Sequence, residues 1–196
     1  MSSDERKAAI IEAAVKVIQQ VGYARLTARK IAEHPNIALG HITYNFKDMN
    51  EILVETYRYT SKQLVDTVYS EIEFNDETPL ENLRNFLSIF FKPDFLKKDF
   101  LRLRIDLWSA ALASEEIMST ERALYDRYRS VLSSLISKIA LHRRQGVENV
   151  PLLVDAVTSL QDGLWLDWER RHDERTIENG LNACIILVNS MLPEAK

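Results

Sequence analysis

Residues 26–53, with the sequence LTARKIAEHPNIALGHITYNFKDMNEIL, predict two short helices, a tight turn between them and the start of a longer third helix. Thr27 is a good cap for the first helix, because its side-chain oxygen can accept a hydrogen bond from a backbone N–H one turn later. Pro35 ends that helix, since the residue before a proline is pushed out of the α region. Asn36 tolerates the left-handed conformation that such a turn needs. This arrangement is typical of a helix-turn-helix.

The composition of the chain favours an all-α fold made of long helices. The sequence has 196 residues, of which 46% are hydrophobic, and it contains only five glycines and five prolines. No run of about 18 apolar residues is present, so we expect no segment that spans a membrane. The first residues lack the apolar centre of a signal peptide, and the single cysteine, Cys184, cannot form an internal disulfide. We therefore expect a soluble, cytoplasmic protein.

Charge is unevenly distributed along the chain. The whole sequence has a formal net charge of −4, whereas residues 1–50 contain seven Lys and Arg against five Asp and Glu. The basic excess of this first part has the sign that a DNA-binding surface needs.

Several residues of the helix-turn-helix stretch keep a characteristic spacing. They are Thr27, Ile31, Ala32, Ile37, Gly40, Ile42, Phe46 and Lys47. This pattern resembles the DNA-binding segment of TetR-type transcriptional regulators, in which a threonine opens the second helix and a Gly-x-hydrophobic-x-x-x-Phe run forms the third. The chain departs from the family at residues 35–38, where Pro-Asn-Ile-Ala replaces Ala-Gly-Val-Ser, and at Thr43 and Met49, where Tyr and Lys are usual. The resemblance implies a three-helix head that binds DNA.

The polar face of the second short helix is the expected DNA-contacting surface. Asn and His side chains can hydrogen-bond to base edges or phosphates, Tyr and Lys reach phosphate oxygens, and a glycine lets the helix backbone approach the duplex. The alternative is an ordinary solvated helix face. The candidate DNA-binding residues are Thr27, Arg29, Leu39, Gly40, His41, Thr43, Tyr44, Asn45 and Lys47.

Beyond this head, the spacing of apolar residues predicts further helices. One helix precedes the head from Asp4 to Val21, and a long helix capped by Asp48 follows it to about Glu73. Thr78 and Thr176 are the expected caps of two later helices. The buried stripe predicted for the helix before residue 114 is Leu101, Ile105, Trp108 and Leu112. We place the functional boundary at residue 48, with a DNA-binding domain at 1–48 and an effector-binding and dimerisation domain at 49–196.

Aromatic residues on the apolar stripes suggest a ligand site. Asp162 lies three residues before Trp165 on a helix that looks buried, and an acid there needs a partner. Rings combined with a carboxylate suit an organic cation. The segments LWSAAL at 107–112 and DGLW at 162–165 resemble the C-terminal domain of the choline-responsive, BetI-type repressors, which implies a small cationic effector. The candidate ligand-binding residues are Phe86, Phe90, Trp108, Tyr125, Tyr128, Asp162 and Trp165.

Purely structural roles remain an alternative to a ligand site. The tryptophans can be plain core residues, and Asp162 can bond to a neighbouring helix.

The last two predicted helices carry more apolar surface than one packing face covers, which a two-fold dimer would bury. The candidate dimer-interface residues are Leu160, Leu164, Ile177, Leu181, Cys184, Val188 and Met191.

No enzyme motif accompanies these features. The four histidines lack metal-ligand spacing, and the chain has no glycine-rich phosphate loop, nucleophile elbow or CxxC pair, so we expect no cofactor and no metal site. The resemblances imply a transcriptional regulator, by default a repressor, that binds a palindromic double-stranded DNA operator as a homodimer and is released by a small-molecule effector. Activation stays open. The alternative is a helical ligand-binding adaptor that has lost DNA binding, which Ala38 and Met49 make conceivable.

Overall fold

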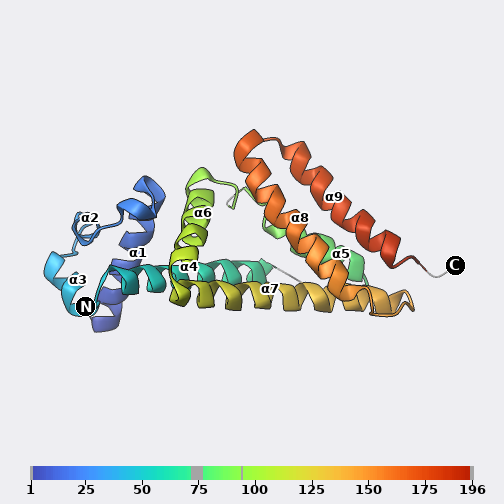
Figure 1. The fold of residues 1–196 in the computed structure, drawn as a ribbon, viewed down its shortest axis with the longest axis horizontal. Coiled ribbons are helices and arrows are strands. Elements are labelled where there is room, and N and C mark those ends of the chain that lie inside the picture. Colours follow the sequence, from blue (N-terminus) through green and yellow to red (C-terminus); the bar gives the residue numbers. More distant parts are fainter. Residues whose placement is uncertain (1, 72–76, 94, 195–196) are drawn as a thin grey trace. The chain divides into compact units, whose positions relative to one another are not determined.

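The computed structural model describes residues 2–71, 77–93 and 95–194, and in this part of the chain every regular element is a helix (Figure 1). The expected all-α fold is therefore confirmed. The elements are α1 (Ser3–Val21), the 3₁₀ turn η1 (Tyr23–Arg25), α2 (Ala28–Ala32), α3 (Leu39–Asn45), α4 (Met49–Glu71), α5 (Pro79–Ile89), α6 (Lys98–Ala113), α7 (Glu115–His142), α8 (Val150–Arg171) and α9 (Glu174–Met191). No described helix is both long and apolar enough to cross a bilayer.

The chain divides into two compact units. The first unit comprises residues 1–66 and 97–124, and the second comprises residues 67–96 and 125–196. The helix-turn-helix head thus shares a unit with the whole of α6 and the beginning of α7. The functional boundary expected at residue 48 falls inside the first unit, and it stays a prediction.

Local capping and turn chemistry define the head as the sequence predicts. The hydroxyl of Thr27 accepts a hydrogen bond from the backbone N–H of Lys30 at 3.3 Å and so caps α2. Gly22 ends α1 with a φ of 85°, and Asn36 makes the turn before α3 with a φ of 66°. The three helices then bury one apolar cluster, whose members include Ile10, Ala14, Val17, Ile31, Ile42 and Phe46.

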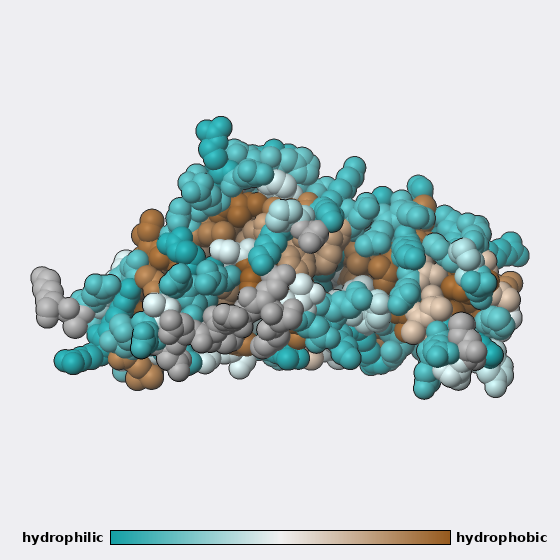
Figure 2. Space-filling view, turned by 180° about the vertical axis from the view of Figure 1, so that it is seen from behind, coloured by the Kyte–Doolittle hydropathy of each residue, from teal (hydrophilic) through white to brown (hydrophobic). Residues whose placement is uncertain are grey.

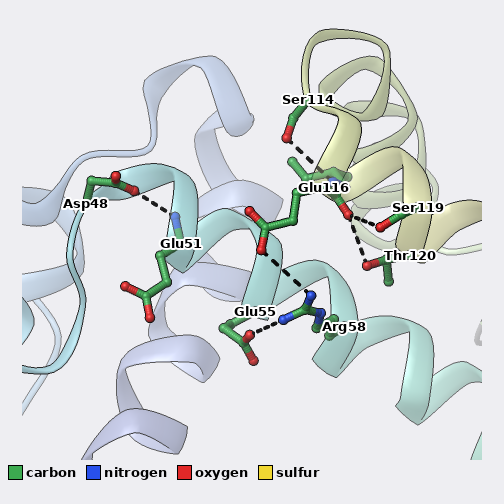
Figure 3. A network of polar contacts seen from close by, with 9 residues as sticks. Asp48, Glu51, Glu55, Arg58, Ser114, Glu116, Ser119 and Thr120 are labelled. Carbon is green, nitrogen blue, oxygen red and sulfur yellow. Dashed lines mark hydrogen bonds and ion pairs between the residues drawn. The ribbon is translucent and has the colours of Figure 1, made fainter.

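The beginning of α4 is held by polar contacts to its own first turn and to α7 (Figure 3). The carboxylate of Asp48 accepts from the backbone N–H of Glu51 at 2.9 Å, which confirms the predicted cap. Further along, Arg58 pairs with Glu55 at 2.6 Å and with Glu116, in the first turn of α7, at 3.7 Å. These ion pairs are exposed, so each contributes little to stability.

Helix α6 buries only part of the stripe that its spacing predicts: Leu101 is buried and Trp108 is half-buried, but another face carries most of the packing. Leu103, Leu107 and Ala110 pack with Ile18 of α1 in one cluster, whereas Ile105 and Leu112 of the predicted stripe are exposed. Two stripes with equal spacing run along this helix, and periodicity cannot choose between them.

Polar contacts also join α6 to the end of α1. The backbone N–H of Tyr23 donates to Asp106 at 3.0 Å, and Arg102 donates to the carbonyl of Gln20 at 3.3 Å. A Cβ at Gly22 would lie 3.2 Å from the Asp106 carboxylate, so a glycine permits the close approach of the two helices. The carbonyls that α1 leaves unpaired at its end are therefore partly satisfied by α6.

In the second unit, α8 and α9 lie side by side (Figure 1). They approach closely because Gly180 of α9 has no side chain: a Cβ there would lie 2.3 Å from a methyl group of Leu164. The end of α9 is held by the buried Arg143, which donates to the carbonyl of Leu192 at 2.6 Å and to Asn189 at 2.9 Å.

Two predicted caps are corrected. The side chain of Asp173, rather than that of Thr176, accepts the capping hydrogen bond of α9, from the backbone N–H of Arg175. Thr78 precedes α5 but makes no side-chain capping bond, and the helix begins with Pro79 at its first turn.

Candidate functional site

The outer face of α3 carries most of the predicted DNA-contacting residues. Tyr44 is 84% exposed, and Leu39 and His41 are also exposed. The hydroxyl of Thr43 is exposed but donates back to the carbonyl of Gly40 at 3.2 Å. The polar residues of this face that remain available to contact a base edge are therefore His41 and Tyr44.

Gly40 has no reason to be a glycine within the protein itself. A Cβ at this position would meet nothing within 4 Å, and the residue lies in a regular helix. A glycine in a helix costs about 0.5–1 kcal/mol relative to alanine. The open space is consistent with close approach by something outside the chain, as the sequence predicts for DNA.

The remaining predicted contacts flank α3. Lys47 and Arg29 are exposed, and their cationic groups suit phosphate oxygens. Thr27 is exposed as well, but its hydroxyl accepts the capping bond of α2. The contacts of these residues with DNA stay predictions.

Asn45 is the exception to the expected DNA face, because it is only 9% exposed. Its side-chain NH₂ donates to the carbonyl of His41 at 2.7 Å, and its side-chain oxygen accepts from the hydroxyl of Ser3 at 3.3 Å. Both ends of the amide thus bind within the protein. Its expected role as a base reader is revised: the structure assigns it to holding the end of α3 against the first turn of α1.

We expect Asn45→Ala to lower operator affinity about tenfold for every DNA sequence, since it removes a buried hydrogen bond that positions α3, worth about 1.5 kcal/mol at most. His41→Ala should instead change the base preference, because one base contact discriminates by about 1–3 kcal/mol. Selection from a random DNA pool, with affinities of the selected sites, measures both effects. A changed base preference in Asn45→Ala would restore the original assignment.

The aromatic residues of the second unit form a compact cluster. The rings of Phe86 and Tyr128 are stacked with their centres 5.3 Å apart, and Phe90 meets both edge-on at 5.5 Å. The Tyr128 hydroxyl donates to the side-chain oxygen of Gln161, which in turn donates from its NH₂ to the carbonyl of Leu87 at 3.0 Å. Burial, followed by the negative charge of Asp162, raises the pKa of Tyr128 well above its usual value.

The other predicted ligand residues are distributed around this cluster or away from it. Asp162 is exposed, which corrects the expectation of an acid buried on a helix that looks buried. Trp165 meets Phe91, with ring centres 6.3 Å apart. Tyr125 faces the guanidinium of Arg129 at 5.6 Å. Trp108 belongs to the first unit, whereas Asp162 and Trp165 belong to the second, and a cavity shared by the three stays a prediction.

Most predicted dimer-interface residues pack inside the protomer. Cys184 and Val188 have no exposed surface, and burial raises the pKa of the Cys184 thiol to about 11, so it acts as a small apolar residue. Leu164 and Ile177 are buried in one cluster. Leu160, Leu181 and Met191 are half-buried. The exposed apolar residues of these helices are instead Leu152, Leu166 and Ile186.

Sequence reasoning missed a polar group in the interior of the first unit. Tyr57, Ser61 and Arg104 are buried there, and Arg104 lies 3.9 Å from Glu121. Their positions on apolar helices carried no motif, and only the packing of α4, α6 and α7 makes them an interior group.

Comparison with known families identifies this architecture. Residues 10–56 match the family model of bacterial regulatory proteins of the tetR family, and residues 79–193, more than half of the chain, match the BetI-type transcriptional repressor C-terminal model. The chain belongs to the TetR family, with a BetI-type C-terminal domain. It is a DNA-binding transcriptional regulator and not an enzyme.

Individual relatives agree with the family. The HTH-type transcriptional regulator BetI of Pectobacterium carotovorum subsp. carotovorum is 24% identical over 192 residues, covering 95% of this chain and 94% of its own. A transcriptional regulator from Pseudomonas aeruginosa superposes on the regulator with a TM-score of 0.82 at 21% identity, covering 97% of this chain and 92% of that one. A regulator from Saccharomonospora viridis, solved in complex with choline, has a TM-score of 0.76 at 19% identity, covering 95% and 96% of the two chains.

Proposed function

We propose that the regulator is a dimeric, cytoplasmic repressor that binds a palindromic operator and is released by a small organic cation. The observation that carries the DNA half of this proposal is the exposed outer face of α3, with His41 and Tyr44 directed at solvent and Gly40 open to close approach. The basic residues Arg29 and Lys47 beside it supply phosphate contacts. Two such helices about 34–36 Å apart would enter successive major grooves on one side of the duplex.

The proposed dimer is supported by the exposed side of α8 and α9. The exposed hydrophobic residues of these two helices are Leu152, Leu166 and Ile186, of which Ile186 is 66% exposed. Elsewhere, Figure 2 shows hydrophobic patches among hydrophilic residues on one face of the molecule. Gly163 lies on the exposed side of α8 near Leu166, and a Cβ there would meet nothing within 4 Å. A helical glycine without an internal packing reason suits the close crossing of a helix from a second copy. A stable dimer of this kind buries at least about 2,000 Å².

The proposed effector site is supported by the cluster of aromatic rings and by the nearby acid Asp162. Phe86, Phe90 and Tyr128 present aromatic surface near the charge of Asp162, and a cation over an aromatic face gains about 0.5–2 kcal/mol. The Saccharomonospora viridis neighbour in complex with choline and the BetI relatives support a ligand of this class. Release follows if the ligand binds better to the form whose α3 helices have the wrong spacing.

The proposal is tested by measuring binding of the regulator to the DNA upstream of its own gene at several salt concentrations. We expect tight, salt-sensitive binding, since Lys and Arg displace counterions from the duplex. Choline chloride should weaken this binding more than an equal concentration of sodium chloride does. Absence of salt-sensitive DNA binding would instead support the adaptor alternative.

Two substitutions are expected to weaken the choline response. Asp162→Asn and Phe90→Leu should each raise the choline concentration needed for release about fivefold to thirtyfold, as expected from losing about 1–2 kcal/mol of cation binding. DNA binding without choline should be unchanged, because neither residue lies in the head. Asp126→Asn, an exposed acid on α7, is the matched control and should respond like the natural protein. An unchanged response in both variants would place the cation elsewhere.

A further inference from the structure

An arginine of the second unit lies over an aromatic ring and beside an acid. The central carbon of the Arg129 guanidinium is 5.6 Å from the centre of the Tyr125 ring, and the two residues are four apart on α7. The same guanidinium donates to the carboxylate of Asp155 on α8 and forms an ion pair with it. One positive charge is thus held by an aromatic face and a carboxylate from two different helices.

Tyr125 and Asp155 supply the two kinds of group that recognise an organic cation. The face of an aromatic ring attracts a positive charge, whether the charge belongs to an arginine or to a ligand. The carboxylate adds the attraction between opposite charges. A substituted ammonium ion would therefore meet the same two attractions that hold Arg129, so a side chain of the protein takes the place that suits such a ligand.

Both partners of Arg129 are open to solvent. Tyr125 and Asp155 are exposed, and the Arg129 side chain is itself half-buried between them and the surface. A cation can therefore approach the ring and the carboxylate from outside the protein. An ion pair with this exposure contributes little to stability, so Arg129 can leave Asp155 at small cost.

The ring cluster of the proposed effector site adjoins this place. Tyr128, whose ring stacks on that of Phe86, is three residues after Tyr125 and directly precedes Arg129 on α7. Burial raises the pKa of the Tyr128 hydroxyl, the charge of Asp162 raises this pKa further, and the charge of Arg129 opposes the rise. The acid of the effector site and the arginine therefore act on the same hydroxyl.

We propose that Tyr125 and Asp155 form a second subsite for the organic cation, which Arg129 occupies in this structure and which the effector takes by displacing it. The inference rests on the cation effector proposed above and adds the residue that competes with it. Asp155 and Asp162 are seven residues apart and so lie on one face of α8, which favours a second subsite alongside the ring cluster. Arg129 then lowers the apparent affinity for the effector, because only the form with a displaced arginine can bind it there.

The experiment measures binding of choline chloride to the full-length regulator by titration calorimetry, without DNA and at constant ionic strength. Arg129→Gln should lower the apparent Kd about threefold to thirtyfold, since glutamine removes the competing charge. Arg129→Ala should give the same gain. Arg84→Gln is the matched control and should leave the Kd unchanged, because it removes the same charge from an exposed arginine of α5 that donates to Asn182.

A double variant separates displacement from simple charge repulsion. Removing a positive charge near the site favours any cation, whereas displacement requires the groups that Arg129 releases. Tyr125→Leu changes no charge, and it should cancel most of the gain when it is combined with Arg129→Gln. Survival of the full gain in this double variant would overturn the proposal.

The second subsite and the cation effector can fail separately. Equal choline affinity of the natural protein and of Arg129→Gln would overturn the second subsite alone. Tighter choline binding by Arg129→Gln, without release of operator DNA from that variant, would support the subsite and contradict the cation as effector. Absence of choline binding to both proteins would contradict both proposals.

Discussion

The double substitution Leu166→Arg with Ile186→Arg is expected to convert the regulator into a folded monomer that no longer recognises its operator. Both side chains are exposed on the protomer, at 41% and 66%, so arginine at these positions should not disturb the fold. In the proposed dimer, the same positions would place like charges in an apolar contact, at a cost of several kcal/mol. Sedimentation equilibrium and operator titration measure the two consequences.

Operator affinity of this variant should fall to the nonspecific level, about a thousandfold or more below that of the natural protein, because one half-site alone remains. Leu141→Arg is the matched control, since Leu141 is equally exposed but lies at the end of α7, outside α8 and α9. It should remain a dimer with full affinity. A double variant that sedimented as a dimer at micromolar concentration would show that another surface forms the interface.

Leu107→Ala is expected to destabilise the regulator by about 2–5 kcal/mol and Leu112→Ala by less than about 0.5 kcal/mol. Leu107 of α6 has no exposed surface and packs in one cluster with residues of α1, α4 and α7, whereas Leu112 is 83% exposed on the same helix. The two substitutions are chemically identical, so the difference between them isolates burial. Urea unfolding of both variants measures it, through the shift of the midpoint at constant slope.

The opposite order of stabilities would contradict the packing of α6 and restore the stripe that periodicity predicts. Leu107→Ala should also weaken operator binding, because the residue lies next to the contacts through which α6 holds the end of α1. Leu112→Ala should bind DNA as the natural protein does. We thus expect Leu107→Ala to lower both stability and operator affinity, and Leu112→Ala to change neither.

The exposed face of α3 could be predicted from the sequence except at one residue. His41, Tyr44 and Asn45 are all polar residues of one short helix, and their residue types alone make each a candidate base reader. What separates Asn45 is the hydroxyl of Ser3, which lies 42 positions earlier in the chain. A contact between residues so distant in sequence leaves no local signal.

The aromatic cluster of the second unit and the buried hydroxyls of the first differ in the same respect. Phe86, Phe90 and Tyr128 were identified from aromatic side chains on apolar stripes, and the fold brings their rings together. Tyr57 and Ser61 were not identified, because a tyrosine and a serine on an amphipathic helix are ordinary residues until the neighbouring helices bury them. Chemical type is visible in a sequence, whereas the burial of a polar atom is not.

By itself, the sequence determined the helical class, the cap of Thr27, the turn at Asn36 and the family, because capping, turn conformation and motif spacing depend on residues within a few positions of one another. Only the tertiary structure decided which face of α6 is buried, that Cys184 and Val188 fill the protomer, and that Ile186 is left exposed. A helix with apolar residues on more than one side can bury any of them, and the choice depends on how many neighbouring helices pack against it.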